Sequence, residues 1–142
     1  MYSSEVLQRF RAPQFAEHAH DDGPRAQHAA HRPELLVRAG SLSQGALLEL
    51  RAQVEAQRLR SLRFRAYGSP GLIALADAFC AAAQDLPLSE LAQFSLSPLQ
   101  QRLDIPNTEI HVVLLLTEAL QKLNTELQAS TQDKLATDLL SK

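Results

Sequence analysis

The feature that most constrains this chain is a change of hydrophobic periodicity between its two halves. From Gly45 to Val54, and again from Arg58 to Ala66, apolar and polar residues alternate. Such alternation is typical of β-strands that bury one face. From Gly71 onward the apolar residues recur roughly every three to four positions, the spacing of an amphipathic helix. Strands followed by helices predict an α+β fold with the helices packed on one sheet.

Three consecutive strands are predicted over residues 34–39, 45–54 and 58–66, joined by short connections. Short connections favour a three-stranded antiparallel meander with one buried and one solvated face. The competing prediction is a helix over residues 43–60, because Leu, Glu, Arg, Gln and Ala all form helices readily. Local composition favours that helix, whereas the alternation favours the strands.

About four to five helices are expected to cover one face of the sheet. The predicted segments are residues 4–11 capped by Ser4, 71–83, 88–94, a turn that begins at Ser97, 106–127 and 130–141. In the long helix that follows Pro106, the wide buried face is expected to hold Ile110, Val113, Leu114, Thr117, Leu120 and Leu123. Residues 12–33 hold three prolines and four histidines with little periodicity, which predicts an irregular N-terminal segment.

Size and composition indicate one domain spanning residues 1–142. The net charge of −2 gives no reason to expect nucleic acid or a membrane surface as a partner. The single cysteine, Cys80, excludes an internal disulfide and a cysteine-rich metal site, and it fits a cytoplasmic protein. The first residues lack the basic and apolar regions of a signal peptide, and no apolar run is long enough to span a membrane.

Few residues carry an independent chemical signal. Ser69 follows Gly68, but the nucleophile-elbow motif needs glycine two positions before the serine, where Tyr67 stands. Pro70 removes the backbone N–H that an oxyanion hole would use, so we do not expect a hydrolase. His111 is a candidate metal ligand, and the histidines and aspartates of the segment from His18 to His31 could gather a divalent ion.

Three short segments carry a family resemblance. The chain opens with Tyr2 and Ser3 ahead of Pro13. Residues 63–71 read Arg-Phe-Arg-Ala-Tyr-Gly-Ser-Pro-Gly, and residues 103–112 read Leu-Asp-Ile-Pro-Asn-Thr-Glu-Ile-His-Val. In this order and at these separations, over residues 2–127, they resemble the iron–sulfur cluster scaffold family of the NifU N-terminal and IscU type. The resemblance implies the same α+β fold.

The resemblance also implies where a cluster site would lie. In that family three cysteines hold a nascent cluster, and an aspartate beside the first keeps the cluster labile. Matched residue by residue, the cysteine positions fall at Gln44, Ser69 and Val112, and the aspartate position falls at Ala46. Only the histidine before the third position is kept, as His111. Amide, hydroxyl and aliphatic groups do not replace thiolates as iron ligands. The resemblance therefore implies a degenerate member with no expected cofactor.

Two functions follow as expectations. The first is a non-enzymatic protein associated with iron–sulfur cluster assembly, which acts through protein–protein contacts with a cysteine desulfurase or another assembly protein. The alternative is a divalent metal-binding or metal-sensing protein that uses His111 or the His18–His31 segment.

Overall fold

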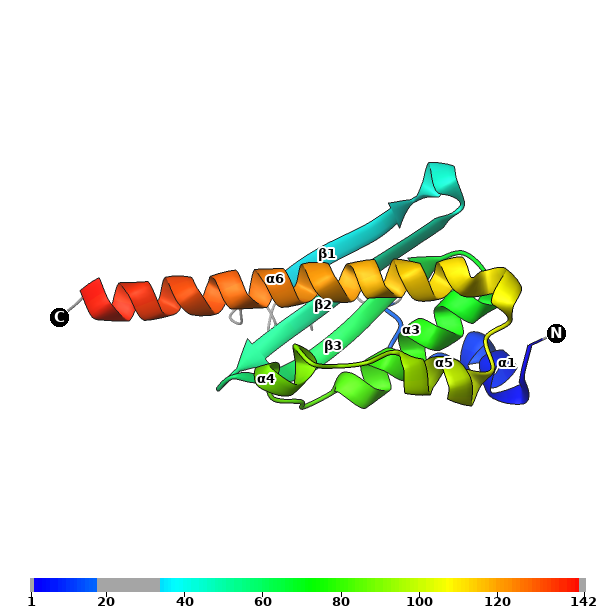
Figure 1. Cartoon of the computed structure of the whole chain (residues 1–142), viewed down its shortest axis with the longest axis horizontal. Coiled ribbons are helices and arrows are strands. Elements are labelled where there is room, and N and C mark those ends of the chain that lie inside the picture. The colour runs from blue at the N-terminus through cyan, green and yellow to red at the C-terminus, as the bar shows by residue number, and fades with distance from the viewer. Residues whose placement is uncertain (1, 18–33, 141–142) are drawn as a thin grey trace.

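The computed structural model describes residues 2–17 and 34–140 of the chain. It shows a three-stranded antiparallel sheet packed with helices, so the predicted α+β fold is confirmed (Figure 1). In chain order the elements are α1 (Ser4–Arg11), β1 (Glu34–Ser41), η1 (Leu42–Gln44), β2 (Ala46–Glu55), β3 (Arg58–Tyr67), α3 (Pro70–Ala83), α4 (Leu88–Leu91), α5 (Ser97–Leu103), η2 (Asn107–Glu109) and α6 (Ile110–Leu140).

The strands pair in the order β1-β2-β3, so β2 is central. Leu50 lies opposite Val37 on one side and Phe64 on the other, and all three side chains are buried on the inner face. The competing helix over residues 43–60 is wrong. The good helix formers of β2 alternate in polarity, and pairing on both sides buries Leu48, Leu50 and Ala52, which outweighs local propensity.

Glycines shape the connection between β1 and β2. Gly45 has a φ of 84°, in the left-handed region that glycine adopts without strain, and it ends the η1 turn. Gly40 has a φ of 79°, and a Cβ placed there would lie 2.3 Å from the carbonyl oxygen of Ala46. These positions allow the chain to reverse tightly at this end of the sheet.

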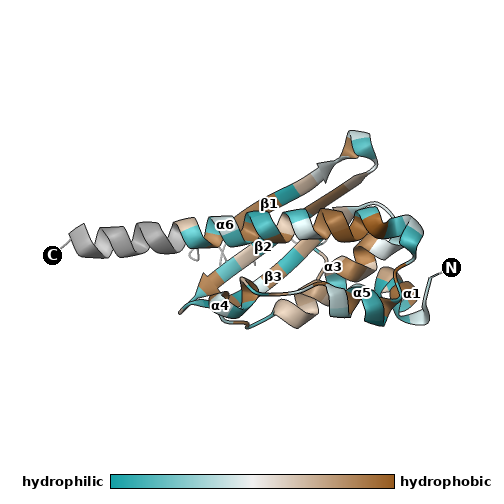
Figure 2. Ribbon diagram, viewed as in Figure 1, coloured by the Kyte–Doolittle hydropathy of each residue, from teal (hydrophilic) through white to brown (hydrophobic). Residues whose placement is uncertain are grey.

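Helices α3 and α6 both pack on the inner face of the sheet. Helix α6 contacts β1 and β2, and α3 contacts β3 (Figure 1). Figure 2 shows that α3 and the first part of α6 are rich in apolar residues. In α3 the predicted stripe is confirmed, since Leu72, Ala76, Phe79, Cys80 and Ala83 are all fully buried. Phe79 meets Phe94 edge to face, with ring centroids 5.2 Å apart.

Several helix predictions need correction. No separate helix begins at Ser130 or Thr131, because α6 runs unbroken to Leu140 and no proline or glycine interrupts it. Within α6 the expected buried face is confirmed in part: Val113, Leu120 and Leu123 are buried. Ile110 and Leu114 are exposed instead, while Val112 and Leu116 are buried. The cap of α1 is Ser3, whose hydroxyl accepts from the Val6 N–H, and no side chain caps α5. Helix α4 ends at Leu91, earlier than predicted.

The residues after α1 are fastened to the core by one carboxylate. Asp77 of α3 is fully buried and accepts hydrogen bonds from the Gln14 and Phe15 N–H groups at 2.8 and 2.9 Å. It also accepts from the Arg9 guanidinium at 2.8 Å. Glu17 N–H then donates to the carbonyl of Phe64 at the edge of β3. The first part of the predicted irregular segment is thus tied to the sheet, and the His18–His31 segment lies outside the described residues.

Across the part of the chain that the structure describes, no helix is both long enough and apolar enough to cross a membrane.

Candidate functional site

The β1–β2 turn, which holds Gln44, meets two of the segments that carry the family resemblance at one end of the sheet, which we call the turn end. It consists of the β1–β2 turn, the junction between β3 and α3, and the start of α6 (Figure 1). A Cβ at Gly40 would lie 2.9 Å from a methyl group of Leu115 in α6. A Cβ at Gly68 would lie 3.7 Å from the Cα of Ala46. The β1–β2 hairpin therefore approaches both α6 and the β3–α3 junction closely.

Gln44 and His111 line the same open groove, which has a volume of about 490 Å³. The groove lies between the β1–β2 turn and the exposed side of α6, and its walls also include Ser41, Leu114 and Glu118. Both Gln44 and His111 are solvent-exposed. The structure therefore brings two of the sequence-predicted positions to one surface.

Ser69 has a structural role at the start of α3. Its hydroxyl accepts a hydrogen bond from the Leu72 N–H at 3.3 Å, which caps the helix. Pro70 occupies the first turn, where its fixed φ suits the helix and its missing N–H is not needed. The same hydroxyl lies in hydrogen-bonding contact with the phenol of Tyr2.

Glu109 is a buried residue of the turn end that sequence reasoning missed. Only 9% of its surface is exposed, and its carboxylate oxygens lie 3.0 and 3.2 Å from where a Cβ of Gly71 would stand. A carboxylate there faces the positive end of the α3 dipole, which stabilises the charge. Tyr2 donates a hydrogen bond to this carboxylate. Burial raises the pKa of Tyr2, and the hydrogen bond and negative charge of Glu109 raise it further.

The sequence around Glu109 has no periodic pattern that would predict a buried carboxylate, because the neighbouring residues are Thr108 and Ile110. The burial of Glu109 depends on Gly71, whose lack of a side chain leaves room for the carboxylate. Together Tyr2, Ser69 and Glu109 form a polar cluster that joins α1, α3 and η2.

The remaining predicted positions do not face solvent in a common site. Val112 is 1% exposed and belongs to the hydrophobic core. Ala46 is half-buried at the start of β2 and packs against that core. Of the family-implied positions, Gln44 and His111 therefore share the groove, Ser69 belongs to the polar cluster, and Val112 is in the interior.

The groups at the turn end do not fit an iron–sulfur cluster. A cluster of the family's kind needs thiolates, and these positions present an amide, a hydroxyl and a valine. Within residues 2–17 and 34–129, no three His, Cys, Asp or Glu side chains gather closely enough to hold a metal ion. A metal site that uses the His18–His31 segment stays a prediction, because that segment is outside the described residues.

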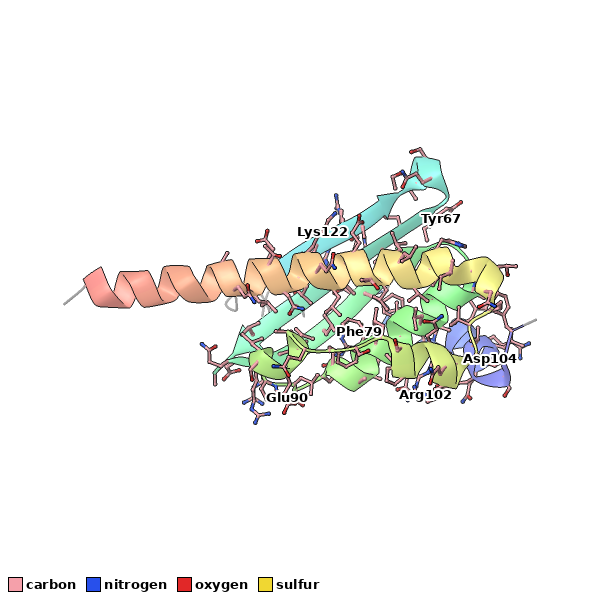
Figure 3. The ribbon with its side chains drawn as sticks, in the orientation of Figure 1. Tyr67, Phe79, Glu90, Arg102, Asp104 and Lys122 are labelled. Atoms are coloured by element: carbon pink, nitrogen blue, oxygen red, sulfur yellow. The ribbon has the colours of Figure 1, made fainter. Side chains whose placement is uncertain are left out.

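Exposed apolar side chains surround the turn end. Leu42, Leu114 and Tyr67 expose 63%, 62% and 59% of their surfaces, and Ile110 exposes 45%. Leu42 belongs to the β1–β2 turn, Tyr67 ends β3, and the other two stand in the first turns of α6. Figure 3 shows Tyr67 at this end of the molecule. Large apolar side chains this exposed are typical of surfaces that bind another protein when they gather in one region.

The arginines of β3 and the single cysteine have structural surroundings of their own. The arginines of β3 make local contacts: Arg63 donates to the carbonyl of Gln14 and lies over the ring of Phe15, and Arg60 pairs with Asp85. Cys80 is fully buried, as expected for a structural cysteine, and burial raises the pKa of its thiol, with the negative charge of Asp77 adding to the effect.

Comparison of the chain with models of protein families gives no match, and comparison with curated protein sequences gives none either.

Proposed function

We propose that this chain is a cluster-free relative of the IscU and NifU scaffold proteins, which acts in iron–sulfur cluster assembly through protein contacts made by its turn end. The proposed partner is a cysteine desulfurase. The protein is not an enzyme in this proposal and holds no cofactor of its own.

One observation carries the proposal. The β1–β2 turn, the β3–α3 junction and the start of α6 meet at the turn end, yet the ligand positions that the resemblance implies there are Gln44, Ser69 and Val112, and exposed apolar side chains surround them. A surface that lacks cluster ligands but exposes Leu42 and Leu114 is suited to binding another protein rather than to holding a cluster. Apolar side chains at the centre of an interface contribute most of its binding energy.

The experiment is a binding titration between this protein and a purified cysteine desulfurase, followed by fluorescence anisotropy. Leu114→Asp places a charge on the turn end and should weaken binding tenfold or more, because the charge must be desolvated in an apolar interface. Leu114 is 62% exposed, so the substitution leaves the core intact. The matched control is Ala92→Asp, which adds the same charge on an exposed position beside α4.

Unchanged affinity of the Ala92→Asp variant, together with weakened affinity of the Leu114→Asp variant, supports docking through the turn end. Absence of any binding by the wild-type protein would remove the desulfurase as partner. Equal binding by the two variants would place the contact elsewhere on the molecule.

A further inference from the structure

The free edge of β1 is a second surface with an identifiable chemistry. Strand β1 pairs with β2 on one side, and on its other side no described residue forms a strand pair with it. The opposite edge of the sheet is different, because Ala16 bridges Phe64 alongside β3. An uncovered strand edge presents backbone N–H and C=O groups that can pair with another strand.

One hydrogen bond identifies which groups of β1 point outward. The Arg38 carbonyl accepts a hydrogen bond from Lys122 Nζ at 2.7 Å, and Figure 3 shows Lys122 on α6 beside the sheet. In an antiparallel ladder the N–H and C=O of one residue point to the same side, and this side alternates along the strand. Glu34, Leu36 and Arg38 therefore present their backbone groups at the free edge.

The side chains of these three residues lie on the outer face of the sheet and are exposed. Along β1 they form a row of one acidic, one apolar and one basic side chain, and the central Leu36 exposes 45% of its surface. Two such rows are complementary when they run antiparallel about Leu36. Glu34 of one copy then stands opposite Arg38 of the other, twice by symmetry, and the two Leu36 side chains meet at the centre. Arg38 already pairs with Glu49 of its own chain at 2.9 Å, so Glu34 would join an existing ion pair.

We propose that a second copy of this chain pairs with it through β1, antiparallel and centred on Leu36, to form a continuous six-stranded sheet. The contact is isologous, as expected for a two-fold dimer. The inner faces also match, since Leu35 stands opposite Val37 of the second copy and both helices α6 lie on the same side. This inference does not depend on the proposed function, because it needs no desulfurase and its paired residues Glu34, Leu36 and Arg38 precede the β1–β2 turn, although Lys122 also lines the groove of the turn end.

Lys122 sets the strength of this pairing. Its ammonium group occupies the Arg38 carbonyl that the second copy needs, so each dimer must displace two lysines. Lysines at strand edges commonly limit pairing in this way. The interface is also small, because one strand from each copy supplies it, so association in the micromolar range is expected.

The first test is sedimentation equilibrium of the full chain over a range of concentrations. The wild-type protein should dimerise. Glu34→Lys replaces two attractive pairs with two repulsive ones and should raise the dissociation constant about tenfold. Glu90→Lys makes the same charge change on exposed α4 and should leave the constant unchanged. Lys122→Ala should lower the dissociation constant, because the edge carbonyl is then free.

The second test fixes the register. Leu36→Cys brings two thiols together across the two-fold axis, at a Cα separation of about 5.5 Å that a disulfide can span. The natural Cys80 is buried and does not interfere. Under mild oxidation this variant should form a covalent dimer much faster than the Gln101→Cys variant, which carries an exposed thiol on α5.

Rapid cross-linking at position 36, with a dimer weakened by Glu34→Lys, supports the pairing. A monomer at all concentrations overturns the proposal. So does a dimer that is insensitive to Glu34→Lys and that cross-links no faster than the Gln101→Cys control.

Discussion

Removing the Asp77 carboxylate should destabilise the protein more than any surface change. Its two oxygens accept hydrogen bonds from the Gln14 and Phe15 N–H groups and from Arg9, all within 2.9 Å, and the residue has no solvent exposure. Asp77→Ala removes all three bonds and leaves two backbone donors without an acceptor. It also leaves the guanidinium of Arg9 without its buried partner.

The magnitude follows from the burial of the two partners. Breaking a buried ion pair by removing one member costs about 3–5 kcal/mol. The Arg9 side chain keeps 23% of its surface exposed and still pairs with Glu5, so the lower end of that range applies. We expect the free energy of unfolding to fall by about 3 kcal/mol. Asp77→Asn retains a carbonyl for the two N–H groups and should cost less.

The assay is guanidinium chloride unfolding followed by circular dichroism, with the free energy extrapolated to water. The control is Glu118→Ala, because the Glu118–Lys122 pair spans 3.9 Å with both side chains about half exposed. That pair should contribute less than about 1 kcal/mol. A loss of under about 1 kcal/mol for Asp77→Ala would refute the account of this carboxylate as the anchor of the N-terminal segment.

Three further predictions concern the turn end and the core. Burial and Glu109 raise the pKa of Tyr2 above its ordinary value of 10.0, so the folded state holds the phenolic proton more tightly than the unfolded state. The contribution of Tyr2 to the free energy of unfolding is therefore fully present below pH 10 and is lost as the pH rises through the folded pKa. Tyr2→Phe should reduce this alkaline loss in urea titrations at several pH values, and an identical pH profile would count against the polar cluster. Gly40→Ala should destabilise the protein far more than Gly45→Ala in thermal melts, since both have positive φ but only Gly40 lacks room for a Cβ; equal effects would contradict the close approach of the turn and α6. Cys80 should react with a thiol reagent only after denaturation, and fast labelling of the native protein would show that it is not buried.

The sheet was predictable because its signal is long and regular. Within residues 48–52 and again within 62–66 every second side chain is apolar, and the observed register turns Leu48, Leu50, Ala52, Leu62 and Phe64 to one buried face. The single-helix alternative rested on propensity, which contributes little per residue compared with burial. The cap at Ser69 was not predicted, and the same Ser-Pro pattern at Ser97 predicted a cap that α5 lacks.

Long-range polar contacts were not predictable from the sequence. The bond between Asp77 and Arg9 joins residues 68 positions apart, and neither carries a local pattern that points to the other. Glu109 is similar, because its burial depends on the space left by Gly71 and on the approach of Tyr2. The error at Ile110 and Leu114, which were expected on the buried face of α6, has another cause. Apolar residues lie on nearly all sides of the first turns of α6. The side that becomes buried therefore depends on how the helix packs against the sheet and α3.

Anaerobic reconstitution with ferrous iron and sulfide tests the central claim most directly. The wild-type protein would be desalted and examined by visible absorption and iron analysis, beside a scaffold protein that carries all three cysteines. The account predicts a colourless protein without stoichiometric iron, because Gln44, Ser69 and Val112 supply no thiolate. A stable absorption band with iron bound in fixed ratio to the chain would contradict the claim that the turn end has lost its cluster.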